Sequence, residues 1–229
     1  MTFFPADRWS RPGIWFLAIW TLGFVAGCQS ERDQFMDEAS HKPFFQPANF
    51  NGDKQLPASL RRVLVLPIYG GHVAETEATS ALDEVLVNAL QKKARFEVVA
   101  ISREEIQRRY GRPEFSSAAV LPRGFLDELG RAYGAEAVLF VDLTQYQPYP
   151  PLSVGFRAKL AIIKDVRLVW TFDDTFSSAD PAVINSIQRV SRQDGAPRSP
   201  VDMSVGTFQS PRRFAAYAIE TMFDTIPPR

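Results

Sequence analysis

The side chains best suited to hold a metal ion are His72, Glu75 and Glu77, which lie close together in the sequence. A zinc site usually needs three or four His, Cys or carboxylate ligands. The chain has only one other histidine, His41, and a single cysteine, Cys28. We therefore expect no metal site and interpret His72 as an ordinary loop residue, with a weak cation cluster as the alternative.

The glycine pair Gly70-Gly71 lies between an apolar run and a helical pattern, a place where many α/β proteins bind phosphate. Glu75 and Glu77 would lie at the positive end of that helix and would repel a phosphate group. The chain contains neither a GxGxxG nor a GxxxxGK motif. We expect no nucleotide cofactor.

Catalytic sets of side chains are not evident either. No Ser-His-Asp or Cys-His combination has an informative spacing. Asp173 and Asp174 are adjacent on a predicted strand, so their carboxylates should point to opposite faces and not cooperate. The sequence therefore predicts a protein that is not an enzyme and has no cofactor.

Cys28 ends a distinctive N-terminal pattern. Arg8 and Arg11 precede an apolar run, Ile14 to Phe24, and Val25-Ala26-Gly27-Cys28 follows at once. A basic start, an apolar stretch and small residues before a cleavage site are typical of secretory signal peptides. The apolar run is about half as long as the roughly 20 residues that a membrane-spanning helix needs.

This N-terminal stretch resembles the signal peptide of bacterial lipoproteins, with Val25 to Cys28 as the lipobox. The resemblance implies cleavage between Gly27 and Cys28 and a lipid on Cys28. Val25 stands where that family most often has leucine. Gln29 replaces the aspartate that keeps enteric lipoproteins in the inner membrane, which implies anchoring in the outer membrane, facing the periplasm. An ordinary secretory signal with a chance cysteine is the alternative.

The overall composition limits the partners that the chain can have. Basic and acidic residues number 26 each, so the formal net charge is zero. This balance gives no electrostatic case for binding nucleic acid or an anionic membrane surface. The hydrophobic content of 45% is ordinary for a globular protein. We expect contact with the membrane only through the lipid, and protein partners, further copies of the chain among them.

Three segments are predicted along the chain. Residues 1–27 form the signal peptide, residues 28–60 the lipidated terminus and a flexible tether, and residues 61–229 a single periplasmic α/β domain. The tether is polar and carries several prolines, which favours an extended, unpaired chain.

Three aromatic residues of this tether do not suit a fully solvated linker. Phe44, Phe45 and Phe50 could dock on the domain's own surface or bind a neighbouring subunit, and the sequence leaves both readings open. Tyr146 and Tyr149, beside a proline run at the end of a predicted strand, are further candidates for contacts with a partner.

The first half of the domain alternates strand and helix patterns. The continuous apolar run 63–66 predicts a strand buried on both faces, and a helix with Thr76 as N-cap follows. A second short strand covers 96–101. Ser102 and Glu105 have the spacing of a capping box, and Gly111 would end that helix.

The second half begins with a helix, with Pro122 in its first turn and Gly134 at its end. Residues 137–141 predict a third buried strand. Two alternating strands follow, an antiparallel pair that turns near Lys164-Asp165. In the second of them, one face is expected to carry the apolar residues Leu168, Trp170, Phe172 and Phe176.

Two more helices close the chain, each preceded by a capping signal. Asp180 and Ser210 each stand before a proline, and residues 193–209 predict a long loop between the two helices. The order of these elements predicts an α/β fold with a single mixed sheet of about five strands, packed with about five helices.

Several of these segments resemble periplasmic α/β domains of envelope assembly. Residues 62–67 resemble the opening strand of these domains, 129–139 their helix, glycine turn and third strand, and 157–160 with Val169-Trp170 their closing hairpin. The group includes the amino-terminal domain of the Tol–Pal periplasmic protein, the curli secretion lipoprotein, and ring-forming lipoproteins of exopolysaccharide export. Residues 163–167 lack the Asp-x-x-Thr-Gly turn that these relatives often carry.

The resemblance implies a non-catalytic accessory or scaffold component of an envelope assembly, secretion or export system, acting through protein–protein contacts. One alternative is a lipid-anchored periplasmic hydrolase or glycan-binding protein. Another is an oligomeric secretion pore, although no inserted pair of strands has the roughly 10-residue length needed to span a membrane.

Overall fold

The apolar run near the start of the domain forms the middle strand of a parallel trio. In the computed structural model, which describes residues 43–193 and 206–229, β2 (Arg62–Val65) lies between β3 (Glu97–Ala100) and β4 (Ala137–Gln147) and is parallel to both. Parallel strands are covered on both faces, which explains the unbroken apolar pattern of β2.

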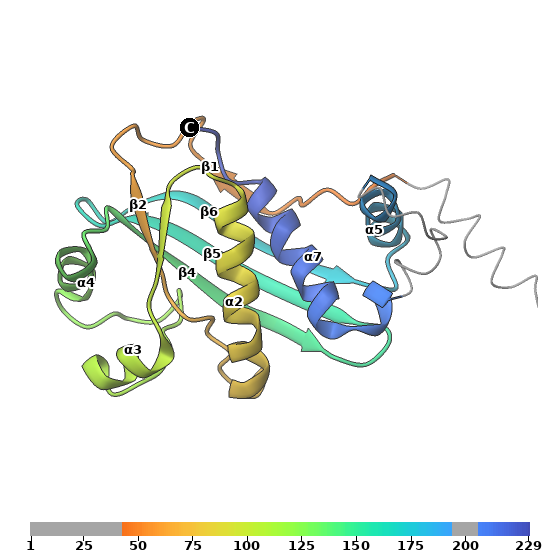
Figure 1. Cartoon of the computed structure of the whole chain (residues 1–229), viewed down its shortest axis with the longest axis horizontal. Coiled ribbons are helices and arrows are strands. Elements are labelled where there is room, and N and C mark those ends of the chain that lie inside the picture. Colours follow the sequence, from red (N-terminus) through yellow and green to blue (C-terminus); the bar gives the residue numbers. More distant parts are fainter. Residues whose placement is uncertain (1–42, 194–205) are drawn as a thin grey trace, which may run out of the picture. The chain divides into compact units, whose positions relative to one another are not determined.

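The alternating strands form the antiparallel half of the same sheet. β5 (Ser153–Ile162) pairs with β4 and with β6 (Arg167–Ser177), and β1 (Phe50–Gly52) adds to the outer edge of β6. The strand order is β1-β6-β5-β4-β2-β3 (Figure 1). The predicted α/β fold with a single mixed sheet is confirmed, with six strands in place of about five.

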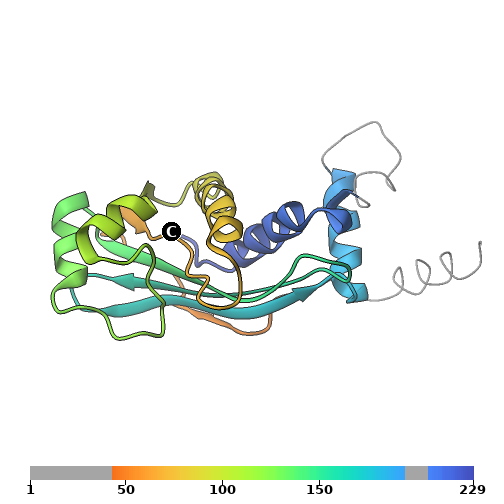
Figure 2. The ribbon, with the colours of Figure 1, turned by 90° about the horizontal axis from the view of Figure 1, so that it is seen from below.

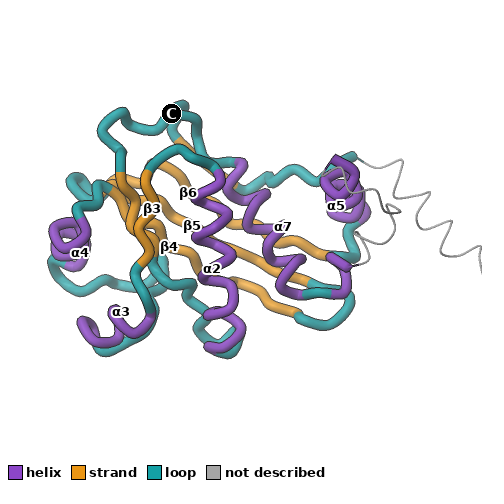
Figure 3. Tube along the Cα trace, viewed as in Figure 1, coloured by secondary structure: helices purple, strands orange, loops and turns teal. Residues whose placement is uncertain are grey.

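Helices cover the sheet from both sides. α2 (Thr76–Lys92) and α7 (Pro211–Asp224) lie side by side over one face (Figures 1 and 3). α5 (Pro181–Gln193) follows β6 and adds apolar side chains to the same core. α3 (Arg103–Tyr110) and α4 (Phe125–Tyr133) enclose a second core on the other face of β2 and β4. Seen edge-on, α2 and α7 lie on one side of the long strands (Figure 2).

Several expected helix ends are confirmed. The Ser102 hydroxyl accepts a hydrogen bond from the Glu105 amide at 3.2 Å, so the capping box forms at the start of α3. Gly111 and Gly134 end α3 and α4 with φ of 74° and 61°, a left-handed conformation that glycine adopts without steric cost. Asp180 and Ser210 cap the helices that follow them.

Two helix starts differ from expectation. Thr76 is the first residue of α2, not its cap; Glu75 holds the cap position without a side-chain hydrogen bond. Pro122 does not lie in the first turn of α4, because its carbonyl closes a separate turn with the Phe125 amide at 3.1 Å and Gly124 reverses the chain before the helix begins.

The expected apolar face of β6 is wrong at Leu168. Leu160 pairs with Trp170, but the next pair is Ala161 with Leu168, so β6 holds one extra residue at this point. Such a bulge exchanges the faces of the residues before it. As a result Leu168 is 47% exposed, whereas Val169 is 1% exposed and lies in the core.

The start of the domain also differs from the expected boundary at residue 61. The compact unit begins at Pro43, and residues 43–60 lie on it. The Phe45 amide donates to the Ala182 carbonyl at 3.1 Å, and Leu56 and Leu60 are buried. Apolar side chains spaced along this segment therefore join it to the core.

Several sequence-based predictions lie outside the described residues. They are the signal peptide, the lipobox with its cleavage site at Gly27 and Cys28, and the tether up to residue 42. Within the predicted loop 193–209, Gln193 ends α5 and residues 206–209 are helical, and the remainder lies outside. No helix in the described ranges is both long enough and apolar enough to cross a bilayer.

Candidate functional site

The loop after β2 lies where α/β proteins commonly bind ligands. The chain leaves β2 through α2 to reach β3 on one side, and then returns through α3 and α4 to β4 on the other side. This reversal makes the carboxyl end of β2 a topological switch point, the usual position of a binding crevice.

The backbone donors at this switch point already have an acceptor. The amides of Gly70 and Gly71 both donate to Glu114 Oε1, at 3.1 and 3.2 Å. A carboxylate from the loop after α3 thus takes the place that a phosphate or substrate anion would occupy. Gly70 must be glycine, because an added Cβ would lie 2.6 Å from the Thr79 methyl carbon.

Arg103, the first residue of α3, joins this carboxylate to α2. Its guanidinium donates to Asp83 through Nε at 2.7 Å, to Glu114 through Nη1, and to the Ile68 carbonyl through Nη2 at 2.7 Å. Asp83 Oδ1 also accepts the Ile68 amide at 2.8 Å. We call Asp83, Arg103 and Glu114 the ion-pair cluster.

Burial sets the electrostatics of the ion-pair cluster. The Arg103 side chain is only 9% exposed. Burial raises the pKa of Asp83, and hydrogen bonds from Arg103 and from the Ile68 amide offset part of that rise. The cluster holds together the loop after β2, helix α2 and helix α3.

Sequence reasoning did not identify this cluster. One signal was available, because Asp83 lies between Leu82 and Leu86, which form the inward face of α2. A carboxylate beside an apolar helical stripe usually has a buried partner. The identity of that partner depends on contacts between residues far apart in sequence.

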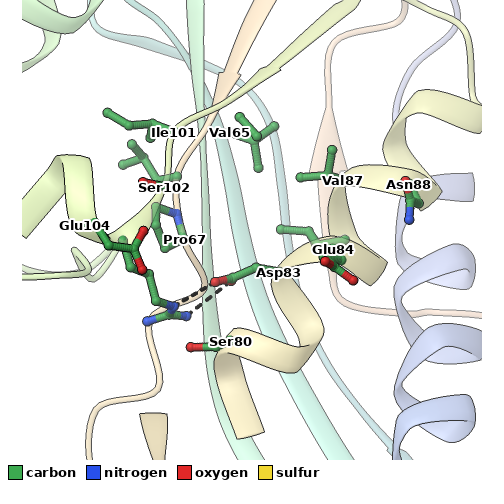
Figure 4. A pocket seen from close by; sticks show the side chains of 14 residues that line it. Val65, Pro67, Ser80, Asp83, Glu84, Val87, Asn88, Ile101, Ser102 and Glu104 are labelled. Atoms are coloured by element: carbon green, nitrogen blue, oxygen red, sulfur yellow. Dashed lines mark hydrogen bonds and ion pairs between the residues drawn. The ribbon is translucent and has the colours of Figure 1, made fainter. Parts of the chain in front are cut away.

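A groove opens beside the ion-pair cluster, between α2 and the segment that runs from β3 into α3 (Figure 4). Its volume is about 720 Å³. Asp83 is bonded to the guanidinium of Arg103 across the groove. The close-up shows Ser80 and Glu84 on α2, and Ser102 and Glu104 at the start of α3 on the opposite side (Figure 4).

The side chains weighed for chemistry do not assemble into a catalytic or metal site. His72, Glu75 and Glu77 are exposed, and among the described residues no group of three His, Cys, Asp or Glu side chains could hold a metal ion. Asp173 bonds to Arg157 at 2.8 Å, whereas Asp174 accepts the Ala48 amide at 3.0 Å. The two adjacent carboxylates therefore serve different partners.

Two of the five aromatic contact candidates belong to the domain's own core. The Phe45 ring lies 4.8 Å from that of Phe176. Tyr146 pairs with Val154, which pairs in turn with Phe176, so both candidates reach the same end of the sheet. Tyr146 is partly buried, and burial raises its pKa.

The other three candidates are open to solvent. Tyr149 is 76% exposed after β4, and Phe44 and Phe50 are about half exposed. The Arg189 guanidinium lies 4.7 Å above the Phe44 ring. These three rings are therefore exposed, unlike those of Phe45 and Tyr146.

The chain matches no protein-family model and no curated protein. Among solved structures it is similar to a PelC dodecamer from Paraburkholderia phytofirmans, with 12% identity, a TM-score of 0.44 and coverage of 79% of this chain and 96% of that one. It is also similar to lipoprotein GNA1162 from Neisseria meningitidis, with 17% identity, a TM-score of 0.43 and coverage of 58% and 95%. A third is the C-terminal domain of LpoB from Salmonella enterica, with 16% identity, a TM-score of 0.33 and coverage of 62% and 93%.

Proposed function

We propose that this chain is a lipid-anchored component of the bacterial envelope that works through contacts with other proteins. It acts without catalysis, as an accessory or scaffold part of an assembly, secretion or export system. Its place is the outer membrane, facing the periplasm. The observation that carries this proposal is the ion-pair cluster at the carboxyl end of β2.

The ion-pair cluster supports a non-catalytic role because its members already occupy the backbone amides and the guanidinium that would otherwise bind a ligand. Glu114 holds the two glycine amides, and Arg103 holds Glu114 and Asp83. An incoming anion would have to displace Glu114 and leave a charge in a partly buried place, which costs several kcal/mol. The switch point therefore serves as internal support.

The lipobox supports the anchoring part of the proposal. Cys28 would carry the lipid, and the compact unit begins at Pro43. About 15 residues separate Cys28 from Pro43, and a fully extended chain of this length spans at most about 50 Å. The domain would thus stay near the membrane surface, within reach of other envelope proteins.

The exposed aromatic residues support the contact part of the proposal. Tyr149 presents a large ring to solvent, and tyrosine is enriched in the central parts of protein interfaces. Phe50 is exposed on the three-residue edge strand β1. These rings are the first positions at which to look for a partner.

Anchoring and contact are tested together in cells. Cys28→Ala should abolish labelling with radioactive palmitate, leave the unprocessed precursor and change the membrane fraction that holds the protein.

A photo-crosslinking residue at position 149 should capture one defined envelope protein, and the same residue at Val120, which is 95% exposed, serves as the matched control. Normal processing of Cys28→Ala, or equal capture at both positions, would contradict the proposal.

A glycan-binding role is a second candidate, supported by a hollow of about 370 Å³ on the face of β5 and β6 away from α2 and α7. Asn51, Arg157, Lys159 and Asp173 line it. Arg157 donates to Asp173 and Lys159 to the Ser117 carbonyl, both at 2.8 Å, and sugar hydroxyls would share these partly exposed groups without leaving a buried charge unpaired. Calorimetric titration with soluble periplasmic glycan fragments tests this role, and Lys159→Ala should weaken any binding.

A further inference from the structure

Edge strand β3 offers unpaired backbone groups beside the groove described above. The amides of Glu97 and Ile101 donate inward, to the Arg61 carbonyl at 2.7 Å and the Val65 carbonyl at 3.2 Å. Because alternate residues of a strand direct their amides to opposite sides, those of Val98 and Ala100 point away from β2. In the described part of the sheet, β3 is the last strand at this edge.

The floor of the groove is apolar and has room for side chains. It includes Val65, Leu86, Val87 and Ile101. Ala100 pairs with Val65, so its side chain faces α2, yet it is exposed because a single methyl group does not fill the space. Apolar side chains placed next to β3 would be covered by α2.

The charge along the groove is negative. Three carboxylates line it, those of Asp83, Glu84 and Glu104, together with one guanidinium, that of Arg103. Arg103 is bonded to Asp83 and Glu114, so a single guanidinium is shared between two carboxylates. Hydrogen bonds from the Glu104 amide and Ser102, together with the nearby charge of Arg103, lower the pKa of Glu104, so this carboxylate stays ionised. The Glu84 side chain is 81% exposed and forms a long ion pair of 3.7 Å with Arg212. With Glu114, four carboxylates therefore face two guanidiniums, and the groove keeps an excess of negative charge.

We propose that a basic, extended segment of a partner protein adds to the edge of β3 and lies in the groove between β3 and α2. This inference rests on the proposed role through protein contacts and names the surface and the chemistry of the partner. Backbone hydrogen bonds to Val98 and Ala100 would supply affinity. Alternate side chains would enter the apolar groove, and lysine or arginine would meet Glu84 and Glu104.

Labelled peptides test this docking on the full chain in mild detergent. The probes are fluorescein-labelled Lys-Val-Lys-Val-Lys, its Glu-Val-Glu-Val-Glu counterpart, and the lysine peptide with N-methylated valines. Fluorescence anisotropy should show binding of the first peptide alone, and added salt should weaken it. Hydrogen exchange should slow at the amides of Val98 and Ala100 when this peptide is present.

Variants of the chain separate the groove from general charge. Glu84→Lys combined with Glu104→Lys should lower the affinity for the lysine peptide at least tenfold. Glu128→Lys combined with Asp165→Lys makes the same change in net charge away from the groove and should keep the affinity. Ala100→Phe should also lower it, because the ring fills the groove.

Some outcomes overturn the inference. They are equal binding of the lysine and glutamate peptides, equal affinity in the two double variants, or exchange protection away from β3. The denaturation midpoint of each double variant is measured beside that of the unchanged chain. Equal midpoints show that a loss of binding does not result from unfolding.

The outcome for docking is separate from the outcome for the proposed function. If the peptides fail to bind while the crosslink from position 149 still forms in cells, docking on β3 is wrong and the accessory role stands. If the lysine peptide binds to β3 as expected but no envelope protein is captured from position 149, the accessory role is wrong.

Discussion

Arg103 connects two carboxylates that come from different segments of the chain. All three of its guanidinium nitrogens donate, to Asp83, to Glu114 and to the Ile68 carbonyl. A partly buried pair of this kind adds little net stability over apolar packing, but removing one partner leaves an uncompensated charge. The main role of Arg103 is therefore to hold the loop after β2 in place, because its charge is already neutralised by bonded carboxylates.

Arg103→Met should lower the free energy of unfolding by about 3–5 kcal/mol, because it keeps most of the side-chain volume and leaves Asp83 and Glu114 unpaired. Urea denaturation followed by circular dichroism measures this change. Arg108→Met is the control, since Arg108 is 73% exposed and its pair with Glu105 should contribute less than about 1 kcal/mol. Equal losses in the two variants would contradict the role given to the cluster.

The difference between Arg103→Met and the unchanged chain should shrink as the pH falls below neutral. Burial raises the pKa of Asp83 above that of the unfolded chain, and Arg103 offsets part of the rise. Without Arg103 the pKa rises further, so the folded variant takes up a proton more readily than the unfolded variant and gains stability as the pH falls through that folded pKa. Denaturation midpoints at pH 7.5 and pH 5 test this, and a constant difference would contradict it.

The element that most changes the expected organisation is β1 with the segment around it. Phe50 pairs with Phe172, and Gly52 pairs with Trp170. Leu56 and Leu60 then bury their side chains against the first core. Residues 43–60 therefore supply the sixth strand, β1, which pairs with the outer edge of β6, and add two apolar side chains to the core.

A chain that begins at residue 61 should be less stable than one that begins at Pro43. The shorter chain loses the buried side chains of Leu56 and Leu60, each worth about 1.5–3 kcal/mol, as well as the strand β1. Urea denaturation of both chains gives the comparison. If their midpoints agree, the segment 43–60 contributes no stability and behaves as a tether.

At the scale of the whole molecule, the two cores found among residues 43–193 and 206–229 share the strands β2 and β4. Val65 and Leu139 face the first core, while Leu64 and Val138 face the second. Because neither core can be lost without disturbing the strands between them, residues 43–229 should unfold in a single transition.

Trp170 provides the measurement for this single transition. Three of the four tryptophans precede Cys28, so cleavage there leaves only Trp170, which is 1% exposed and donates from Nε1 to the Thr225 hydroxyl at 3.0 Å. Emission of the processed protein should shift to longer wavelength on unfolding, with the same midpoint as far-ultraviolet circular dichroism. Separate midpoints would indicate that the two cores unfold independently.

Features that depend on residues close together in the chain could be predicted from the amino-acid sequence. The apolar run of β2, the capping box at Ser102 and the glycine ends of α3 and α4 follow from rules that act over a few positions. Together they predict the α/β class and most of the element order. The sequence also shows a lipobox pattern and no catalytic motif. Lipid attachment at Cys28 and the lack of catalysis, which these features suggest, remain predictions.

Features that join residues far apart in the chain became evident in the fold alone. Asp83, Arg103 and Glu114 come from three segments, and β1 pairs with a strand more than a hundred positions later. The bulge that buries Val169 and exposes Leu168 depends on the register between β5 and β6. Local patterns cannot specify such contacts, because their energy arises only when the chain brings both partners out of water together.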